Sequence, residues 1–162
     1  MSRAFVKEDG PDLAPLPDLP VSPHPNFVTA RGLAALQARL AEVQARLSEL
    51  RARVERLDRA PEAAAERDIR YLEARLASAR PVEPDADCRE VGFGHAVGVV
   101  ADDGTEAAWT IVGEDEADGA RGLIAPTSPL ARALLGARVG DAVVWKRPSG
   151  AVDLEVLSIR VA

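Results

Sequence analysis

The sequence predicts an α+β protein in which an antiparallel coiled-coil hairpin of two helices precedes a small domain of antiparallel β-strands with one short helix. Two patterns indicate this class: leucine-rich 3-4 spacing in residues 27–80, and strand-type alternation of apolar residues in residues 81–162. Six of the 12 prolines fall within residues 1–26, and proline interrupts both helices and sheets. We therefore expect a disordered proline-rich tail, a hairpin and a β-domain, in that order.

The formal net charge of −6 is distributed unevenly among these segments. The tail carries −2, the hairpin +3 and the β-domain −7. An acidic total argues against a protein held on nucleic acid by bulk charge, so any effect on nucleic acid is expected to be indirect. No signal peptide and no run of about 20 apolar residues is present, which leads us to expect a cytoplasmic monomer without membrane contact.

The first helix is expected from about residue 30 to the middle fifties, with Thr29 as its N-cap. Its apolar positions alternate in steps of three and four: Leu33, Leu36, Leu40, Val43, Leu47, Leu50, Val54 and Leu57. A second set has the same kind of spacing: Ala65, Ile69, Leu72, Leu76 and Ala79. Pro61 separates the two sets and is tolerated only near the start of a helix, so the helices should fold back on each other. They either project as an arm roughly 30 to 40 Å long, or pack on the rest of the protein or on a second copy.

In the β-domain, apolar alternation predicts strands at about 91–101, 106–113 and 142–147, followed by a final strand. The final strand changes phase after Val156, and a bulge near residues 156–157 would restore one apolar face. A short helix is expected after Ser128, which is a good N-cap, with Pro129 in the first helical position.

Common catalytic and metal-binding motifs do not fit the sequence. The run Gly92-Phe93-Gly94 precedes strand-like residues instead of a helix, so a phosphate loop is excluded. The acidic run that begins at Glu114 has the spacing of a calcium loop, but Ala125 occupies the position that requires glutamate, and a solvated loop is expected. Cys88 has no histidine at a recognisable spacing. We expect no enzyme active site and no cofactor or metal of the protein's own.

Several segments resemble the GreA/GreB family of bacterial transcript cleavage and elongation factors over about residues 27–162. In the hairpin these are Phe27-Val28-Thr29-Ala30-Arg31-Gly32-Leu33 and Tyr71-Leu72-Glu73-Ala74-Arg75-Leu76-Ala77-Ser78-Ala79. In the β-domain they are Ile111-Val112-Gly113-Glu114-Asp115-Glu116-Ala117-Asp118, Thr127-Ser128-Pro129-Leu130-Ala131-Arg132-Ala133-Leu134-Leu135-Gly136, Val139-Gly140-Asp141 and Pro148-Ser149-Gly150. The β-domain segments are the more specific.

The resemblance implies an FKBP-like β-domain that docks at the rim of the secondary channel of RNA polymerase, with the hairpin reaching toward the active site. It also implies that Asp118, Thr127, Ser128 and Pro129 bind the polymerase. For Ser128 and Pro129 the alternative is helix capping, and both roles can coexist.

The hairpin tip departs from the family. Cleavage-stimulating members carry a Gly-Asp-Leu-x-Glu-Asn-type string whose acids help hold a magnesium ion in the polymerase active site, and this sequence lacks it. The hairpin is also shorter than in GreA, by roughly 10 Å on each helix. Asp58 and Glu62 are the candidate catalytic residues and would share the polymerase magnesium. The alternative is a salt-bridged helix surface, because arginines alternate with these acids.

Three functions stay open. The protein regulates elongation or transcript cleavage on RNA polymerase, either by lending its tip carboxylates or by competing for the channel as the inhibitory Gre-homologous factors do. Alternatively, it is an interaction module of the Rnk type that acts on another enzyme. A prolyl isomerase is disfavoured, because such a pocket needs an aromatic lining and the β-domain offers only Phe93, Trp109 and Trp145.

Overall fold

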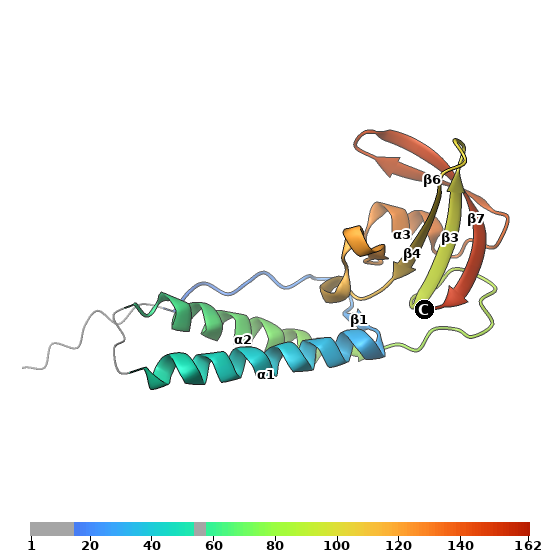
Figure 1. The fold of residues 1–162 in the computed structure, drawn as a ribbon. Coiled ribbons are helices and arrows are strands. Elements are labelled where there is room, and N and C mark those ends of the chain that lie inside the picture. Colours follow the sequence, from blue (N-terminus) through green and yellow to red (C-terminus); the bar gives the residue numbers. More distant parts are fainter. Residues whose placement is uncertain (1–14, 54–57) are drawn as a thin grey trace, which may run out of the picture.

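The computed structural model describes residues 15–53 and 58–162, which form a two-helix arm and a curled β-sheet domain (Figure 1). The α+β class and the order of the two-helix arm before the main sheet are as the sequence predicts, whereas the small β1-β2 sheet at the base of the arm is not predicted. In chain order the elements are β1 (Phe27–Val28), α1 (Ala30–Ala52), α2 (Ala60–Ser78), β2 (Arg80–Pro81), β3 (His95–Ala101), β4 (Glu106–Ile111), the 3-10 helices η1 (Glu114–Glu116) and η2 (Gly119–Arg121), β5 (Leu123–Ile124), α3 (Pro129–Leu134), β6 (Ala142–Arg147) and β7 (Gly150–Val161).

The arm is formed by α1 and α2, which run antiparallel (Figure 1). Their apolar residues pack against each other in one cluster. The predicted cap is confirmed: the Gly32 N–H donates to Thr29 Oγ1 at 2.8 Å. Leu36 and Leu47 of α1 are buried in one cluster with Ala65 and Leu72 of α2. Two predicted members of the stripe, Val54 and Leu57, lie outside the described residues. For the residues that the structure describes, the burial of Leu36, Leu47 and Leu72 confirms the helix-helix contact that the heptad pattern predicts.

The arm projects from the β-domain and meets it at one end only (Figure 1). Helix α1 has 23 residues, which at 1.5 Å per residue gives a length of about 35 Å. Of the arrangements that the sequence allows, the structure therefore has the projecting arm and not helices packed along the β-domain. No helix in residues 15–53 and 58–162 is long and apolar enough to cross a membrane.

The proline-rich segment follows the arm over its described part, residues 15–26 (Figure 1). Arg70 of α2 holds it through an ion pair to Asp18 at 2.6 Å and a hydrogen bond to the Leu16 carbonyl at 2.8 Å. The segment then forms β1, which pairs in parallel with β2 at the base of the arm. The proline pattern predicts an extended, disordered tail, and these contacts give residues 15–26 a path that the pattern does not predict.

The main sheet has five strands in the order β5-β4-β3-β7-β6. All neighbouring strands are antiparallel except β4 and β5, which are parallel. The prediction of a purely antiparallel sheet was therefore wrong at one edge. Strand β5 has only Leu123 and Ile124, and two residues are too few for an alternation pattern to show.

The predicted bulge in the last strand is confirmed. On β3, Gly98 pairs with Ser158 and the next residue pairs with Val156, so Leu157 has no partner there. Leu154 and Val156 are buried before the bulge, and Ile159 packs on the same core after it. Leu157 itself is 41% exposed. The extra residue restores one apolar face to β7.

Helix α3 covers the core of the β-domain and has the predicted ends. Ser128 Oγ accepts from the Ala131 N–H at 3.2 Å, and Pro129 occupies the first position. Leu130 and Leu134 are 3% and 0% exposed, and they pack on residues of β3, β4 and β7. The helix ends before Gly136, whose φ of 82° is the left-handed conformation that glycine favours.

Candidate functional site

The tip of the arm does not present the two candidate catalytic carboxylates as an open pair. Asp58 is exposed, and its Oδ1 accepts from the Ala60 N–H at 2.9 Å, where α2 begins. Glu62, one turn further, is 4% exposed, and the residue is not without an interaction partner. A carboxylate that is buried is poorly placed to reach a metal ion in another protein. The assignment of catalytic roles to both residues stays a prediction, and the burial of Glu62 weighs against it.

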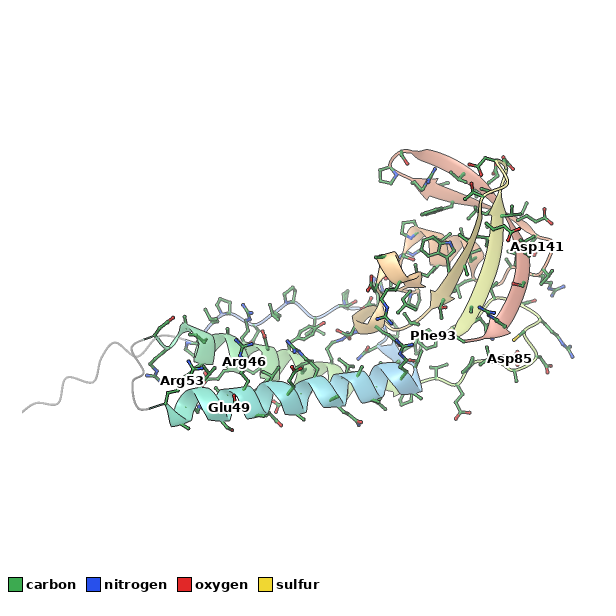
Figure 2. The ribbon with its side chains drawn as sticks, viewed as in Figure 1. Arg46, Glu49, Arg53, Asp85, Phe93 and Asp141 are labelled. Atoms are coloured by element: carbon green, nitrogen blue, oxygen red, sulfur yellow. The ribbon has the colours of Figure 1, made fainter. Side chains whose placement is uncertain are left out.

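Charged residues on the outer half of the arm alternate in sign. Figure 2 shows Arg46 and Glu49 on this part of α1 and Arg53 directly after its end. Across the hairpin, Arg51 and Glu66 form an ion pair at 2.7 Å, with both side chains more than a third exposed. This surface resembles the salt-bridged alternative for the tip more than an acidic metal-binding loop.

The base of the arm is held by Arg75, whose side chain is 1% exposed. Its Nε lies 2.5 Å from Asp115 Oδ2, and its Nη2 donates to Asn26 Oδ1 at 2.7 Å. Nη2 also lies 3.4 Å from Glu114 Oε2. Asn26 in turn donates from Nδ2 to the Arg75 carbonyl at 2.8 Å. A buried guanidinium needs several acceptors of this kind, and here they come from η1 and from the segment before β1.

Tyr71 adds a second bond from α2 to the same carboxylate. Its hydroxyl donates to Asp115 Oδ1 at 2.6 Å. Burial, together with the hydrogen bond to Asp115 and the charge of that carboxylate, raises the pKa of Tyr71 to about 12. Both oxygens of Asp115 are therefore occupied by residues of α2.

Glu116 holds the other helix at its N-terminus. Thr29 donates from Oγ1 to Glu116 Oε2 at 2.6 Å, and Arg31 Nε lies 3.7 Å from Oε1. A carboxylate is favoured here because the first N–H groups of a helix carry partial positive charge. Gly32 permits the approach, since a Cβ at this position would lie 2.6 Å from Glu116 Oε2.

Glu114, Asp115 and Glu116 together form what we call the η1 clamp, which binds α1 and α2 to the β-domain and also the segment before β1, since Ser22 donates from Oγ to Glu114 Oε1 at 3.0 Å. Sequence reasoning missed it and expected a solvated loop in this region. The available signal was the arginine in Tyr71-Leu72-Glu73-Ala74-Arg75, because it lies on the apolar side of a predicted helix and needs an acidic partner.

The four predicted partner-binding residues lie on the chain that follows the η1 clamp. Asp118 Oδ1 accepts from the Ala120 N–H at 3.1 Å and starts η2. Thr127 donates from Oγ1 to Glu114 Oε1 at 3.5 Å, so this residue contacts the clamp. Ser128 caps α3, whereas Pro129 is exposed. The structure brings Thr127, Ser128 and Pro129 together at the start of α3, and their binding role stays a prediction.

The buried histidine of the β-domain is a structural residue. His95 is 1% exposed, its Nδ1 accepts from the Gly92 N–H at 3.0 Å, and its Nε2 lies 2.7 Å from the Asp85 carbonyl. These contacts require a proton on Nε2 and fix the neutral tautomer. Among the residues described, no three His, Cys, Asp or Glu side chains are grouped to hold a metal ion.

Comparison with known proteins places the β-domain in one family. Residues 86–161 match the family described as "Transcription elongation factor, GreA/GreB, C-term". The chain is 45% identical over 96 residues to transcription elongation factor GreB of Neisseria meningitidis, covering 58% of this chain and 59% of that protein. It is 38% identical over 105 residues to transcription elongation factor GreA of Alkalilimnicola ehrlichii, covering 63% of this chain and 66% of that protein.

Each match thus spans less than two thirds of the relative's length. Among solved structures, the crystal structure of GreA factor homolog 1 of Thermus thermophilus aligns with a TM-score of 0.42 and 25% identity, covering 85% of this chain and 99% of that one. The family match includes the η1 clamp and the start of α3, which are the parts that position the arm and the predicted docking residues. The C-terminal domain of this chain, residues 86–161, thus belongs to the GreA/GreB family of transcription elongation factors.

Proposed function

We propose that this protein regulates transcription elongation by binding RNA polymerase at its secondary channel. The C-terminal domain, which we expect to be FKBP-like, would dock on the channel rim, and the arm would insert toward the active site. One observation carries the proposal: a GreA/GreB domain holds a projecting two-helix arm through the buried contact between Arg75 and Asp115.

A factor that works by insertion needs an arm of fixed direction, because a loosely joined arm would lose much of its binding free energy in being ordered. The η1 clamp meets this need. It contacts α2 through Asp115 and α1 through Glu116, so that neither helix can swing without breaking a charged contact. The clamp belongs to the matched domain, which couples rim docking to the position of the arm.

The docking surface in this proposal includes Thr127, Ser128 and Pro129, with Asp118 nearby in the chain. Thr127 contacts Glu114 of the clamp, and Pro129 offers an exposed apolar ring at the start of α3. Residues at such loop-helix junctions are held in place by the fold and are free to contact a partner.

The tip favours a second form of the function, in which the protein occupies the channel without stimulating cleavage. Glu62 is buried, and one carboxylate oxygen of Asp58 accepts a hydrogen bond from the Ala60 N–H at the start of α2. Two carboxylates in this state are weak candidates for sharing the polymerase magnesium. A channel competitor, or an interaction module of the Rnk type that acts on another enzyme, needs no tip chemistry.

The experiment is to add the full chain to a bacterial RNA polymerase elongation complex stalled in a backtracked position. Release of short 3′ RNA products would show cleavage stimulation, and protection of the RNA from an added GreB-type factor would show competition. The matched pair of variants is Asp58→Asn, which keeps an oxygen acceptor for the Ala60 N–H, and Asp68→Asn, which changes an acid within α2. No binding to polymerase would reject both forms and leave the interaction module.

A further inference from the structure

A groove of about 470 Å³ opens on the inner face of the sheet, between the β3-β4 turn and the β6-β7 hairpin. Both turns lie at the end of the β-domain remote from the arm (Figure 1). Its floor includes Val99 and Leu154, which are core residues of the domain, and the partly buried Val152. The groove is therefore an open continuation of the hydrophobic core.

Two tryptophans form the aromatic part of the groove. The rings of Trp109 on β4 and Trp145 on β6 meet edge to face with centroids 6.0 Å apart, and both are partly exposed. They are the only tryptophans in the chain. Phe93, the third aromatic residue of this domain, packs instead against Phe27 at 6.1 Å. The pairing of the strands thus brings together Trp109 and Trp145, which are far apart in the sequence.

Acidic side chains stand at the mouth of the groove. Asp102 and Asp103 lie in the β3-β4 turn, and Asp103 Oδ1 accepts from the Thr105 N–H at 2.9 Å. That backbone hydrogen bond, with a smaller contribution from the charge of Arg147, lowers the pKa of Asp103, which keeps it ionised. A partner's cation entering here would meet two carboxylates beside an apolar floor.

The chain already places one cation of its own on this surface. The guanidinium carbon of Arg147 lies 5.0 Å from the centre of the Trp145 ring, and Arg147 itself is exposed. An aromatic face next to carboxylates is a favourable site for a guanidinium or an ammonium group. Arg147 is the last residue of β6 and its side chain is exposed, so a partner's cation would compete with it for the Trp145 ring.

We infer that this groove binds a peptide segment of a partner protein that carries aliphatic side chains next to lysine or arginine. The aliphatic side chains would lie on Val152 and the tryptophans, and the cation would face Asp102 and Asp103. The groove shares no lining residue with Asp118 or with residues 127–129. The inference is therefore independent of the polymerase docking proposed above and stands if that proposal fails.

Tryptophan emission provides a direct test, because both tryptophans of the chain line this one groove. The probes are Ac-Gly-Lys-Leu-Val-Leu-Lys-Gly-NH2, its counterpart with glutamate in place of lysine, and its counterpart with serine in place of the aliphatic residues. The lysine peptide is expected to change the emission saturably, and more weakly as salt is raised. The glutamate and serine peptides are expected to bind at least about tenfold more weakly.

Three variants test which groups are responsible. Asp102→Asn combined with Asp103→Asn should weaken the lysine peptide, whereas Glu155→Gln, on the opposite face of β7, should leave its binding unchanged. Arg147→Ala removes the internal competitor and should strengthen binding by about two- to fivefold. Thermal unfolding of each variant confirms that it folds.

Equal or tighter binding of the glutamate peptide would overturn the inference. So would the absence of a saturable emission change with the lysine peptide up to about 1 mM. Emission that changed with protein concentration alone would assign the groove to a second copy of the chain, which also contradicts a peptide of this chemistry.

Discussion

The Nε atom of Arg75 lies 2.5 Å from Oδ2 of Asp115, although 40 positions separate the two residues in the sequence. The guanidinium comes from the arm and the carboxylate from the β-domain. This contact, buried on the arginine side, joins α2 to the β-domain and, with the contacts of Glu116 to α1, fixes how the arm leaves the domain. The proposed function depends on that geometry.

Arg75→Ala should destabilise the protein and loosen the arm. Removing the guanidinium leaves Asp115, Asn26 and Glu114 without their shared donor, and breaking such a buried pair typically costs about 3 kcal/mol or more. Urea unfolding measures the loss, and small-angle X-ray scattering should show a broader range of arm positions. Arg67→Ala is the control, because the ion pair of Arg67 within the described residues is with its neighbour Asp68, and both side chains are about a third exposed. An equal effect in both variants would refute the special role of Arg75.

Gly113→Ala should destabilise the junction where Gly119→Ala does not. A Cβ on Gly113 would lie 2.8 Å from the Phe27 carbonyl oxygen, a backbone atom that cannot turn aside, whereas nothing lies within 4 Å of a Cβ on Gly119. Overpacking of this kind typically costs about 1 to 3 kcal/mol. Urea unfolding of the two variants gives the comparison. Equal stability would mean that β1 and the clamp are less tightly packed than the structure indicates.

Tyr71 should titrate well above an ordinary tyrosine. The folded pKa is raised to about 12 from the usual 10, mainly by burial and by the hydrogen bond to Asp115. The folded state favours the neutral form of Tyr71. The contribution of Tyr71 to the free energy of unfolding is therefore complete below pH 10 and is lost as the pH rises from about 10 to 12. The chain has one tyrosine, so absorbance at alkaline pH reports it alone.

The matched variant for this titration is Asp115→Asn, which removes the neighbouring charge and should lower the pKa of Tyr71. A transition near pH 10 in the folded wild-type protein would show that the Tyr71–Asp115 contact does not form.

Ser128→Ala should cost about 1 kcal/mol of stability, the usual effect of losing an N-cap. The substitution removes the oxygen that accepts the hydrogen bond from the Ala131 N–H. Ser149→Ala in the β6-β7 turn is the control. Ser128→Thr keeps the cap and changes only the outer surface, so a fall in polymerase affinity in this variant would reveal the docking role separately. Unchanged stability of Ser128→Ala would contradict the capping role.

Local features of the fold could be predicted from the sequence because their causes are local. The seam around Leu36 and Leu72, the cap at Ser128 and the bulge at Leu157 each follow from spacing within one element. The parallel edge strand was missed because Leu123 and Ile124 are too short a signal.

The candidate site was harder to predict because its contacts join distant parts of the chain. The spacing of the η1 acids resembled a calcium loop, and nothing nearby in sequence indicates Arg75 or Thr29 as their partners. At the tip, residue type alone made Glu62 a candidate ligand, but its burial depends on how α2 packs.

Competition on a backtracked elongation complex tests the central claim most directly. The full chain, added before a GreB-type cleavage factor, should bind RNA polymerase and reduce the release of 3′ RNA fragments, and Arg75→Ala should lose this effect whereas Arg67→Ala retains it. Failure of the wild-type chain to bind polymerase, or equal activity of Arg75→Ala and wild type, would contradict the account.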